Sequence, residues 1–519
     1  MAEETKKKEK QKTRGLMQKL LDGIERVGNK VPHPVVIFLG LTGLVVVLSH
    51  LLYMLGTSVT YDALNITTHQ LEPTTVAVRS LLTGEGIRFI LTSMIRNFMN
   101  FGPVGIILVA MVGVGLAEEA GLMKALIHKV VMVAPSRAIT FILVFVGIVS
   151  SVATDAGYLV LVPLGAAAFY TLGRHPLAGL AAAYAGVAAV FAVNVLIAPL
   201  DGILTEITND AIHLLNPTKS IEITANFYFS VASTILLAFV VTFVSEKIVE
   251  PRLGTYHGGE TAGPGKKDGL TPQEQRGLRN AFWALVGLLV AVAFLTLPSG
   301  APLRHAETGA LIGNSPLMDS LIVLIMLAFL VTGAAYGIGA GTMRSLTDGI
   351  NAIVKTFAGL SGLLFLFLVM SQFIAYFNYS NIATVIAVNL ADWLKSANFP
   401  TLVLLVGFVV VIALLDIILT GAIPKWAIFA PIFVPLFMQL GVGPELVLAA
   451  YRVGDSPINP VTPMMPYFPM MVVFAQKYDK NAGVGTIVSM MLPYTAVLLV
   501  VWTLLLVAWF LLGIPLGPA

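Results

Sequence analysis

Residues that could bind an ion or a charged solute gather near the end of the chain, in the stretch "YRVGDSPINPVTPMMPYF" at 451–468. This stretch carries a guanidinium at Arg452, a carboxylate at Asp455 and an amide at Asn459. Prolines deny a helix its backbone hydrogen bonds here, namely Pro457, Pro460 and Pro463. Carboxylate, amide and freed carbonyl oxygens are hard ligands, so the stretch predicts a site for Na⁺ or a proton.

The role of Arg452 has two interpretations. Arg452 and Asp455 are three residues apart, so on one helix they share a face and could simply neutralise each other. Alternatively, Arg452 binds the carboxylate of a solute. The sequence leaves both possibilities open.

The composition shows what kind of chain positions these groups. Of its 519 residues 57% are hydrophobic and only 11% are charged, which indicates an integral membrane protein. Ionisable groups inside membrane spans are costly unless paired or hydrated, so each is a candidate functional residue. They are Glu118, Glu119, Asp155, Asp201, Asp416, Lys425, Arg452 and Asp455. An interfacial position is the alternative for Glu118, Glu119 and Asp201.

Nine crossings are predicted from apolar runs long enough to span a bilayer as helices. They cover about 33–56, 102–121, 176–200, 226–248, 280–297, 318–340, 358–376, 445–475 and 484–513. Two further apolar stretches, 138–173 and 400–441, are too long for one crossing. Polar or turn-forming residues interrupt both, "SSVATDAG" in the first and "TGAIPK" in the second. Each is therefore predicted to be a re-entrant helical hairpin.

Positive charge supports this layout. The predicted inner loops hold 14 Lys and Arg residues and the outer loops four, with the N-terminus inside. The predicted organisation is a basic cytoplasmic tail at 1–32, a first membrane half at 33–250, a cytoplasmic linker at 251–278 and a second half at 279–519. The hairpins then enter from opposite sides, which makes the halves an inverted repeat.

Each hairpin is followed by an interrupted crossing, the order expected of a secondary transporter with its site at the midplane. In the first half this crossing carries Asn194, opposite Ser151 and Thr154 on the hairpin tip. Structural hydrogen bonds between helices are the alternative role for these three. Trp426 and Tyr467 could stack on an aromatic solute or could serve packing.

Several functional classes lack their signatures. The chain has no cysteine, which excludes disulfides, thiolate metal sites and cysteine nucleophiles. No H-E-x-x-H and no P-loop occurs, so neither an enzyme nor an ATP-driven pump is expected. No cofactor is expected, and the driving force would be a gradient of Na⁺ or H⁺. The net charge of +3 gives no indication of nucleic-acid binding.

Long blocks of the chain resemble the AbgT (p-aminobenzoyl-glutamate transporter) family, which includes MtrF-type antimetabolite exporters. The strongest are "GVGLAEEAGL" at 113–122, "GRHPLAGLAAAYAGV" at 173–187, "APIFVPLF" at 430–437 and "AAYRVGDSPINPVTPMMPYF" at 449–468. The resemblance implies an all-α, cation-coupled carrier in the bacterial inner membrane. It implies a homodimer whose subunits have nine transmembrane helices and two opposed hairpins. Its solutes would be p-aminobenzoyl-glutamate-like aromatic carboxylates or sulfonamide drugs.

The resemblance also assigns roles to residues. Positions that the family uses for transport match Asp201, Arg452, Asp455 and Pro463. Trp426 matches an aromatic residue at the second hairpin tip, and Asp455 with Asn459 matches a proposed sodium site, with Asn194 on the other side. Neither the residues nor the resemblance gives the direction of transport.

The second hairpin tip departs from the family. Where the exporters carry serines, this chain reads Ile423-Pro424-Lys425 before Trp426. Lys425 would either favour a more anionic solute or lie in an aqueous funnel.

Overall fold

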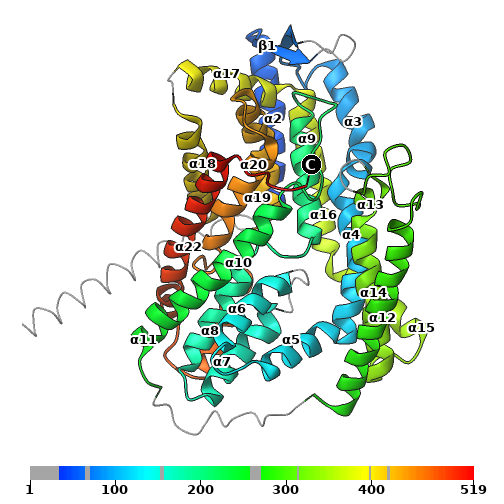
Figure 1. Cartoon of the computed structure of the whole chain (residues 1–519). Helices are drawn as coiled ribbons and strands as arrows, with labels where there is room; N and C mark the ends of the chain where they lie inside the picture. The colour runs from blue at the N-terminus through cyan, green and yellow to red at the C-terminus, as the bar shows by residue number, and fades with distance from the viewer. Residues whose placement is uncertain are drawn as a thin grey trace, which may run out of the picture.

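The computed structural model describes residues 34–64, 71–151, 157–256, 270–311, 315–396, 399–417, 421–463 and 465–518. In these ranges, eight helical stretches are long and apolar enough to cross a membrane. Seven of them lie where uninterrupted crossings are predicted, and the eighth is the second arm of the second hairpin. The all-α membrane fold is thus confirmed (Figure 1). Thr154 and the basic tail lie outside the described residues.

The first half begins with long helices and continues into the first hairpin. Its first elements are α2 (Pro34–Met54), strands β1 (Ser58–Leu64) and β2 (Leu71–Ala77), α3 (Gly84–Met99), α4 (Gly102–Ala120) and α5 (Leu122–Val133). The hairpin has the arms α6 (Ile139–Ser150) and η2–α7 (Gly157–Leu161 and Val162–Thr171). The broken crossing and its neighbours follow, as α8 (Pro176–Tyr184), η3 (Ala185–Ala189), α9 (Pro199–Ile212), α10 (Phe227–Val244), η4 (Ser245–Val249) and α11 (Glu250–Leu253).

The second half repeats this order. It opens with α12 (Pro272–Thr296), α13 (Pro316–Asp319), α14 (Leu321–Ala340), α15 (Leu346–Gly359), α16 (Ser361–Tyr379) and α17 (Ile382–Ser396). The second hairpin has the arms α18 (Thr401–Asp416) and α19 (Ala422–Gln439). It is followed by α20 (Pro444–Asp455), η5 (Ser456–Ile458), α21 (Phe468–Gln476) and α22 (Val484–Leu512). Thr271 caps α12, which therefore begins inside the predicted linker.

The two hairpins lie in opposite halves of the molecule. Figure 1 shows α6 and α7 in the lower half and α18 and α19 in the upper half. Each hairpin packs against the broken crossing that follows it, α6 against η3 and α18 and α19 against α20. The repeat of hairpin, broken helix and long helix is the predicted inverted arrangement.

A small antiparallel sheet was not predicted. Strands β1 and β2 pair from Ser58 with Ala77 to Leu64 with Leu71, in a segment predicted as an outer loop. The sheet follows α2 and lies at the upper end of the molecule in Figure 1. Val59, Thr60, Thr75 and Val76 are β-branched, which suits a strand.

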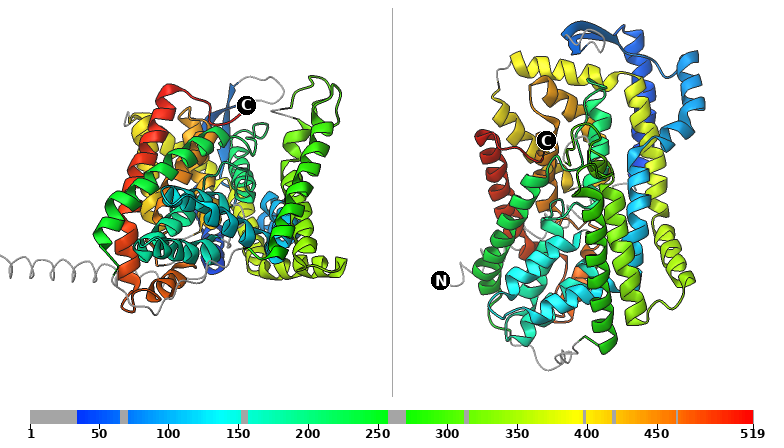
Figure 2. Two further views of the ribbon diagram at one scale, coloured as in Figure 1. Left: turned by 60° about the horizontal axis from the view of Figure 1, so that its bottom comes forward. Right: turned by 45° about the vertical axis from the view of Figure 1, so that its right-hand side comes forward.

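Helix α14 packs closely against α4 and against α12, and α12 and α14 lie together at one edge of the molecule (Figure 2). Glycines allow this approach. A methyl group added at Gly113 of α4 would lie 2.0 Å from the carbonyl oxygen of Met326 in α14. At Gly333 of α14 it would lie 2.7 Å from the Cα of Ala117. The backbones of α4 and α14 therefore touch at positions where only glycine fits.

Replacing Gly113 by alanine is expected to destabilise the protein by about 1–3 kcal/mol, because the new methyl group must push two backbones apart. Gly105 is the matched control in the same helix, since a methyl group there has no neighbour within 4 Å. Gly105→Ala is expected to leave the apparent melting temperature in detergent unchanged or slightly raised. Equal melting temperatures for the two variants would contradict this packing.

Candidate functional site

The two broken crossings contact each other where their helices end. After η3 and after η5 the described backbone is irregular until α9 and α21 begin. The amide N–H of Ala192 donates to Ser456 Oγ at 3.1 Å, and Asn459 Nδ2 donates to the carbonyl of Ala188 at 3.4 Å. Side chains of the second broken crossing thus form hydrogen bonds with backbone groups of the first broken crossing that have no partner within a helix.

Arg452 joins the two crossings by an ion pair. Its side chain is 2% exposed, and its Nη1 donates to Asp201 Oδ1 at 2.5 Å and to the carbonyl of Ala192 at 2.8 Å. Asp201 lies in the first turn of α9, and its other oxygen accepts from the amide of Ala198 at 2.7 Å. Mutual neutralisation of Arg452 and Asp455 is therefore wrong, because the long arginine side chain extends from α20 across to α9.

Asp455 pairs with Lys425 instead. Lys425 Nζ lies 2.7 Å from Asp455 Oδ1 and also donates to Asp416 Oδ1. The hydroxyl of Tyr451 donates to Asp455 Oδ1 at 3.1 Å or to the carbonyl of Ala422 at 2.5 Å. These contacts join the ends of α18 and α20 to the first turn of α19.

Lys425 does not lie in an aqueous funnel, which corrects one of the two expectations for it. The side chains of Lys425 and Asp416 are completely buried. A buried ammonium is tolerated only beside negative charge, and two carboxylates supply that charge here. Asp416 Oδ2 is buried without a hydrogen-bond partner among the described residues.

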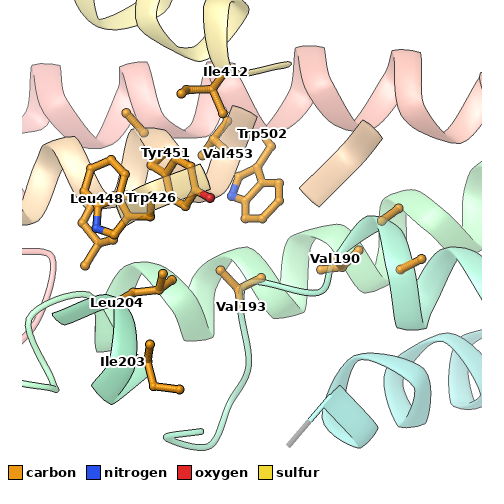
Figure 3. Packing of buried hydrophobic residues seen from close by; sticks show 14 of the residues in the cluster. Val190, Val193, Ile203, Leu204, Ile412, Trp426, Leu448, Tyr451, Val453 and Trp502 are labelled. Carbon is orange, nitrogen blue, oxygen red and sulfur yellow. The ribbon is translucent and has the colours of Figure 1, made fainter. Parts of the chain in front are cut away.

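Trp426 packs inside the protein beside this cluster. Its ring lies beside Tyr451 in Figure 3. The two rings stack with 4.5 Å between their centroids and an interplanar angle of 29°. Trp426 Nε1 donates to Thr208 Oγ1 at 2.9 Å, so α19 is attached to α9. Tyr467 stacks on Tyr158 in the same way, at 4.2 Å. In this structure both aromatic residues have the packing role.

Asn194 contacts the tip of the first hairpin. Its Nδ2 donates to the carbonyl of Ile148 at 3.0 Å and to Ser151 Oγ at 3.1 Å. Its Oδ1 accepts from the amide of Leu196 at 3.0 Å. These are structural hydrogen bonds of the kind named as the alternative. Pro463 is half-buried in the irregular segment between η5 and α21.

These contacts bear on whether Na⁺ could bind at the predicted ligands. Na⁺ needs several oxygen atoms directed at it, and a neighbouring positive charge repels it. Asp455 Oδ1 already lies 2.7 Å from the Lys425 ammonium, and the Asn194 amide oxygen accepts from a backbone N–H. As they stand, these groups do not fit a free Na⁺ at Asp455 Oδ1.

Some members of the site were not predicted from the sequence. They include Thr208 and Tyr451. Asp416 and Lys425 are predicted as ionisable groups inside the membrane spans, but not as partners of Asp455. A useful signal was available, because several carboxylates and one lysine within apolar stretches must find partners of opposite charge. No comparable signal pointed to Thr208.

Known proteins resemble this chain along nearly its whole length. The sequence profile of the AbgT putative transporter family matches residues 19–519. The p-aminobenzoyl-glutamate transport protein of Escherichia coli (strain K12) is 36% identical over 500 residues, which are 96% of each chain.

Two solved structures are also similar. The Alcanivorax borkumensis YdaH transporter, described as having an unusual topology, is 37% identical with a TM-score of 0.87, covering 94% of this chain and 100% of its own. Neisseria gonorrhoeae MtrF, described with a class of antimetabolite efflux pumps, is 39% identical with a TM-score of 0.89, covering 96% and 99%. Both structures share the fold described above, and the family profile and the sequence relative cover nearly the whole chain. The chain belongs to the AbgT putative transporter family.

Proposed function

We propose that this protein is a secondary transporter of p-aminobenzoyl-glutamate or related aromatic carboxylates. It would work in the bacterial inner membrane, with a cytoplasmic N-terminus and as a homodimer. A gradient of Na⁺ or H⁺ would drive it, coupled at the broken crossings around Asn194, Asp455 and Asn459. The relative named for p-aminobenzoyl-glutamate transport supports the choice of solute.

The observation that carries this proposal is the buried pair of Arg452 and Asp201 between the two broken crossings. A guanidinium can bind a carboxylate through two parallel N–H groups. The Nε of Arg452 is buried with no hydrogen-bond partner among the described residues, so it retains a donor for an anion. A solute carboxylate would then exchange with, or share, the position of Asp201.

The arrangement of the hairpins supports alternating access. In transporters built from inverted repeats, one repeat moves against the other around a site near the midplane. Here the second hairpin is attached to α9 of the first half through Trp426, and to α20 through Lys425. Movement of α18 and α19 would change both attachments and expose the pair of Arg452 and Asp201 to one side.

Export of sulfonamide antimetabolite drugs by a proton gradient is the second candidate function. The similarity to MtrF, at 39% identity over 96% of this chain, favours it. Sulfonamides resemble the p-aminobenzoyl part of the first solute, so one site could accept both. The direction of net transport would follow from the imposed gradients.

Purified protein in liposomes tests both candidates. Labelled p-aminobenzoyl-glutamate and a labelled sulfonamide are each offered under an imposed Na⁺ gradient and, separately, under an imposed H⁺ gradient. Saturable accumulation of at least one solute under one gradient is expected, with none in protein-free liposomes. If neither gradient moves either solute, the proposed function is wrong. Flux that does not saturate would indicate a channel.

A further inference from the structure

Lys425 lies at the meeting point of three elements that must move if the second hairpin moves. Asp416 is the last residue of α18, Lys425 is in the first turn of α19, and Asp455 is the last residue of α20. All three side chains are 2% exposed or less. The ammonium group therefore holds both arms of the hairpin to the broken crossing.

The charges around Lys425 define a closed cation site. Its ammonium faces carboxylates of α18 and α20, and the Tyr451 hydroxyl oxygen lies 3.1 Å from Asp455 Oδ1. The other cation described nearby, Arg452, is paired with Asp201. Two carboxylates and one ammonium leave one negative charge. Without Lys425 two negative charges would remain, so the cluster would attract a cation strongly.

We propose that the Lys425 ammonium is a built-in cation, which occupies the position between Asp416 and Asp455 that a free Na⁺ would otherwise take. This inference rests on the proposed function of ion-driven transport and narrows it. Because the positive charge is tethered to α19, Na⁺ cannot enter or leave this position during transport. A Na⁺ gradient coupled at this position is therefore not expected to drive transport, and of the two gradients named above we expect the H⁺ gradient to do so. Lys425 is a residue that determines ion specificity.

The first test measures binding of Na⁺ without any solute. Apparent melting temperatures in detergent are compared in NaCl and in choline chloride at equal ionic strength. The wild-type protein is expected to melt at the same temperature in both salts. In choline chloride, Lys425→Ala is expected to melt at a lower temperature than the wild-type protein. Na⁺ is expected to raise the melting temperature of this variant saturably by about 3 °C or more. Lys355→Ala, which removes an exposed pair with Glu119, is the control and should not respond.

A charge-matched double variant covers the case in which Lys425→Ala does not fold. Asp416→Asn with Lys425→Gln removes one negative and one positive charge, so the cluster keeps its single net negative charge. Asp455 then keeps its carboxylate and gains amide oxygens as neighbours. The same Na⁺-dependent rise in melting temperature is expected.

Two results overturn the inference. The first is that Na⁺ raises the melting temperature of the wild-type protein, or that a Na⁺ gradient drives its transport. The other is a folded Lys425→Ala protein, or a folded double variant, that does not respond to Na⁺. In liposomes, Lys425→Ala is expected to gain at least about tenfold stimulation of uptake by Na⁺, because Na⁺ then restores the missing charge. Na⁺-dependent melting without any transport would contradict the proposed function and leave the inference standing.

Discussion

Replacing Arg452 by alanine is expected to abolish gradient-driven accumulation of solute and to destabilise the protein by about 3–5 kcal/mol. The second effect follows because the Asp201 carboxylate loses its partner in a nearly closed site. The first follows because the guanidinium is the donor proposed to bind the solute carboxylate. Accumulation in liposomes and the apparent melting temperature in detergent measure the two effects separately.

Charge-matched variants distinguish solute binding from structural pairing. Asp201→Asn combined with Arg452→Gln removes the pair without leaving a buried charge, so most of the stability is expected to return. Transport is expected to remain absent, because no guanidinium is left to bind the carboxylate of the solute. Arg452→Lys keeps the positive charge but loses the planar guanidinium, which can donate two parallel hydrogen bonds to a carboxylate. Weaker binding of the solute is therefore expected.

A second ion pair serves as the control for stability alone. Arg174 forms two hydrogen bonds with Glu250, at 2.5 and 2.9 Å. Arg174 lies just before α8, at the opposite end of α8 and η3 from the break in the first crossing. Arg174→Ala is expected to lower the melting temperature while transport per folded molecule is retained. Full transport by the double variant of Arg452 and Asp201 would show that the pair is only structural.

The fold could be predicted because local sequence determines where these helices break. "SSVATDAG" and "TGAIPK" place turn-forming residues in the middle of apolar stretches, and Pro457 and Pro460 prevent continuation of α20. These effects act over a few residues. The sheet of β1 and β2 was missed, although its β-branched residues were a usable signal, because it lies in a polar loop outside the predicted crossings.

The partners within the site could not be predicted in the same way. Asp201 and Arg452 are 251 residues apart, and their contact depends on how the two halves pack. Sequence spacing offers Asp455 as one possible partner of Arg452, because spacing relates only neighbours on one helix. Lys425 illustrates the same limit, because its burial depends on α18, α19 and α20 meeting. Thus the candidate residues followed from the sequence, whereas their pairing required the structure.

Replacing Trp426 by alanine is expected to destabilise the protein by about 3–5 kcal/mol, the usual cost of removing a buried tryptophan. The ring is fully buried, stacks on Tyr451 and attaches α19 to α9 through Thr208. Trp426→Phe keeps an aromatic ring against Tyr451 but loses the N–H donor and part of the indole volume, so a smaller loss of about 1–3 kcal/mol is expected. Melting temperatures of the two variants check this order.

Trp502 provides the matched control for the function of Trp426. It is equally buried and donates to Ser233 Oγ at 2.9 Å, but it joins α22 to α10 instead of attaching the hairpin. Trp426→Ala and Trp502→Ala are expected to lower the melting temperature to a similar extent. Transport per folded molecule is expected to fall strongly only in Trp426→Ala, because the second hairpin then loses its attachment to the first half. A Trp426→Ala protein that melts like wild type and has a raised KM for solute would instead indicate that this ring contacts the solute.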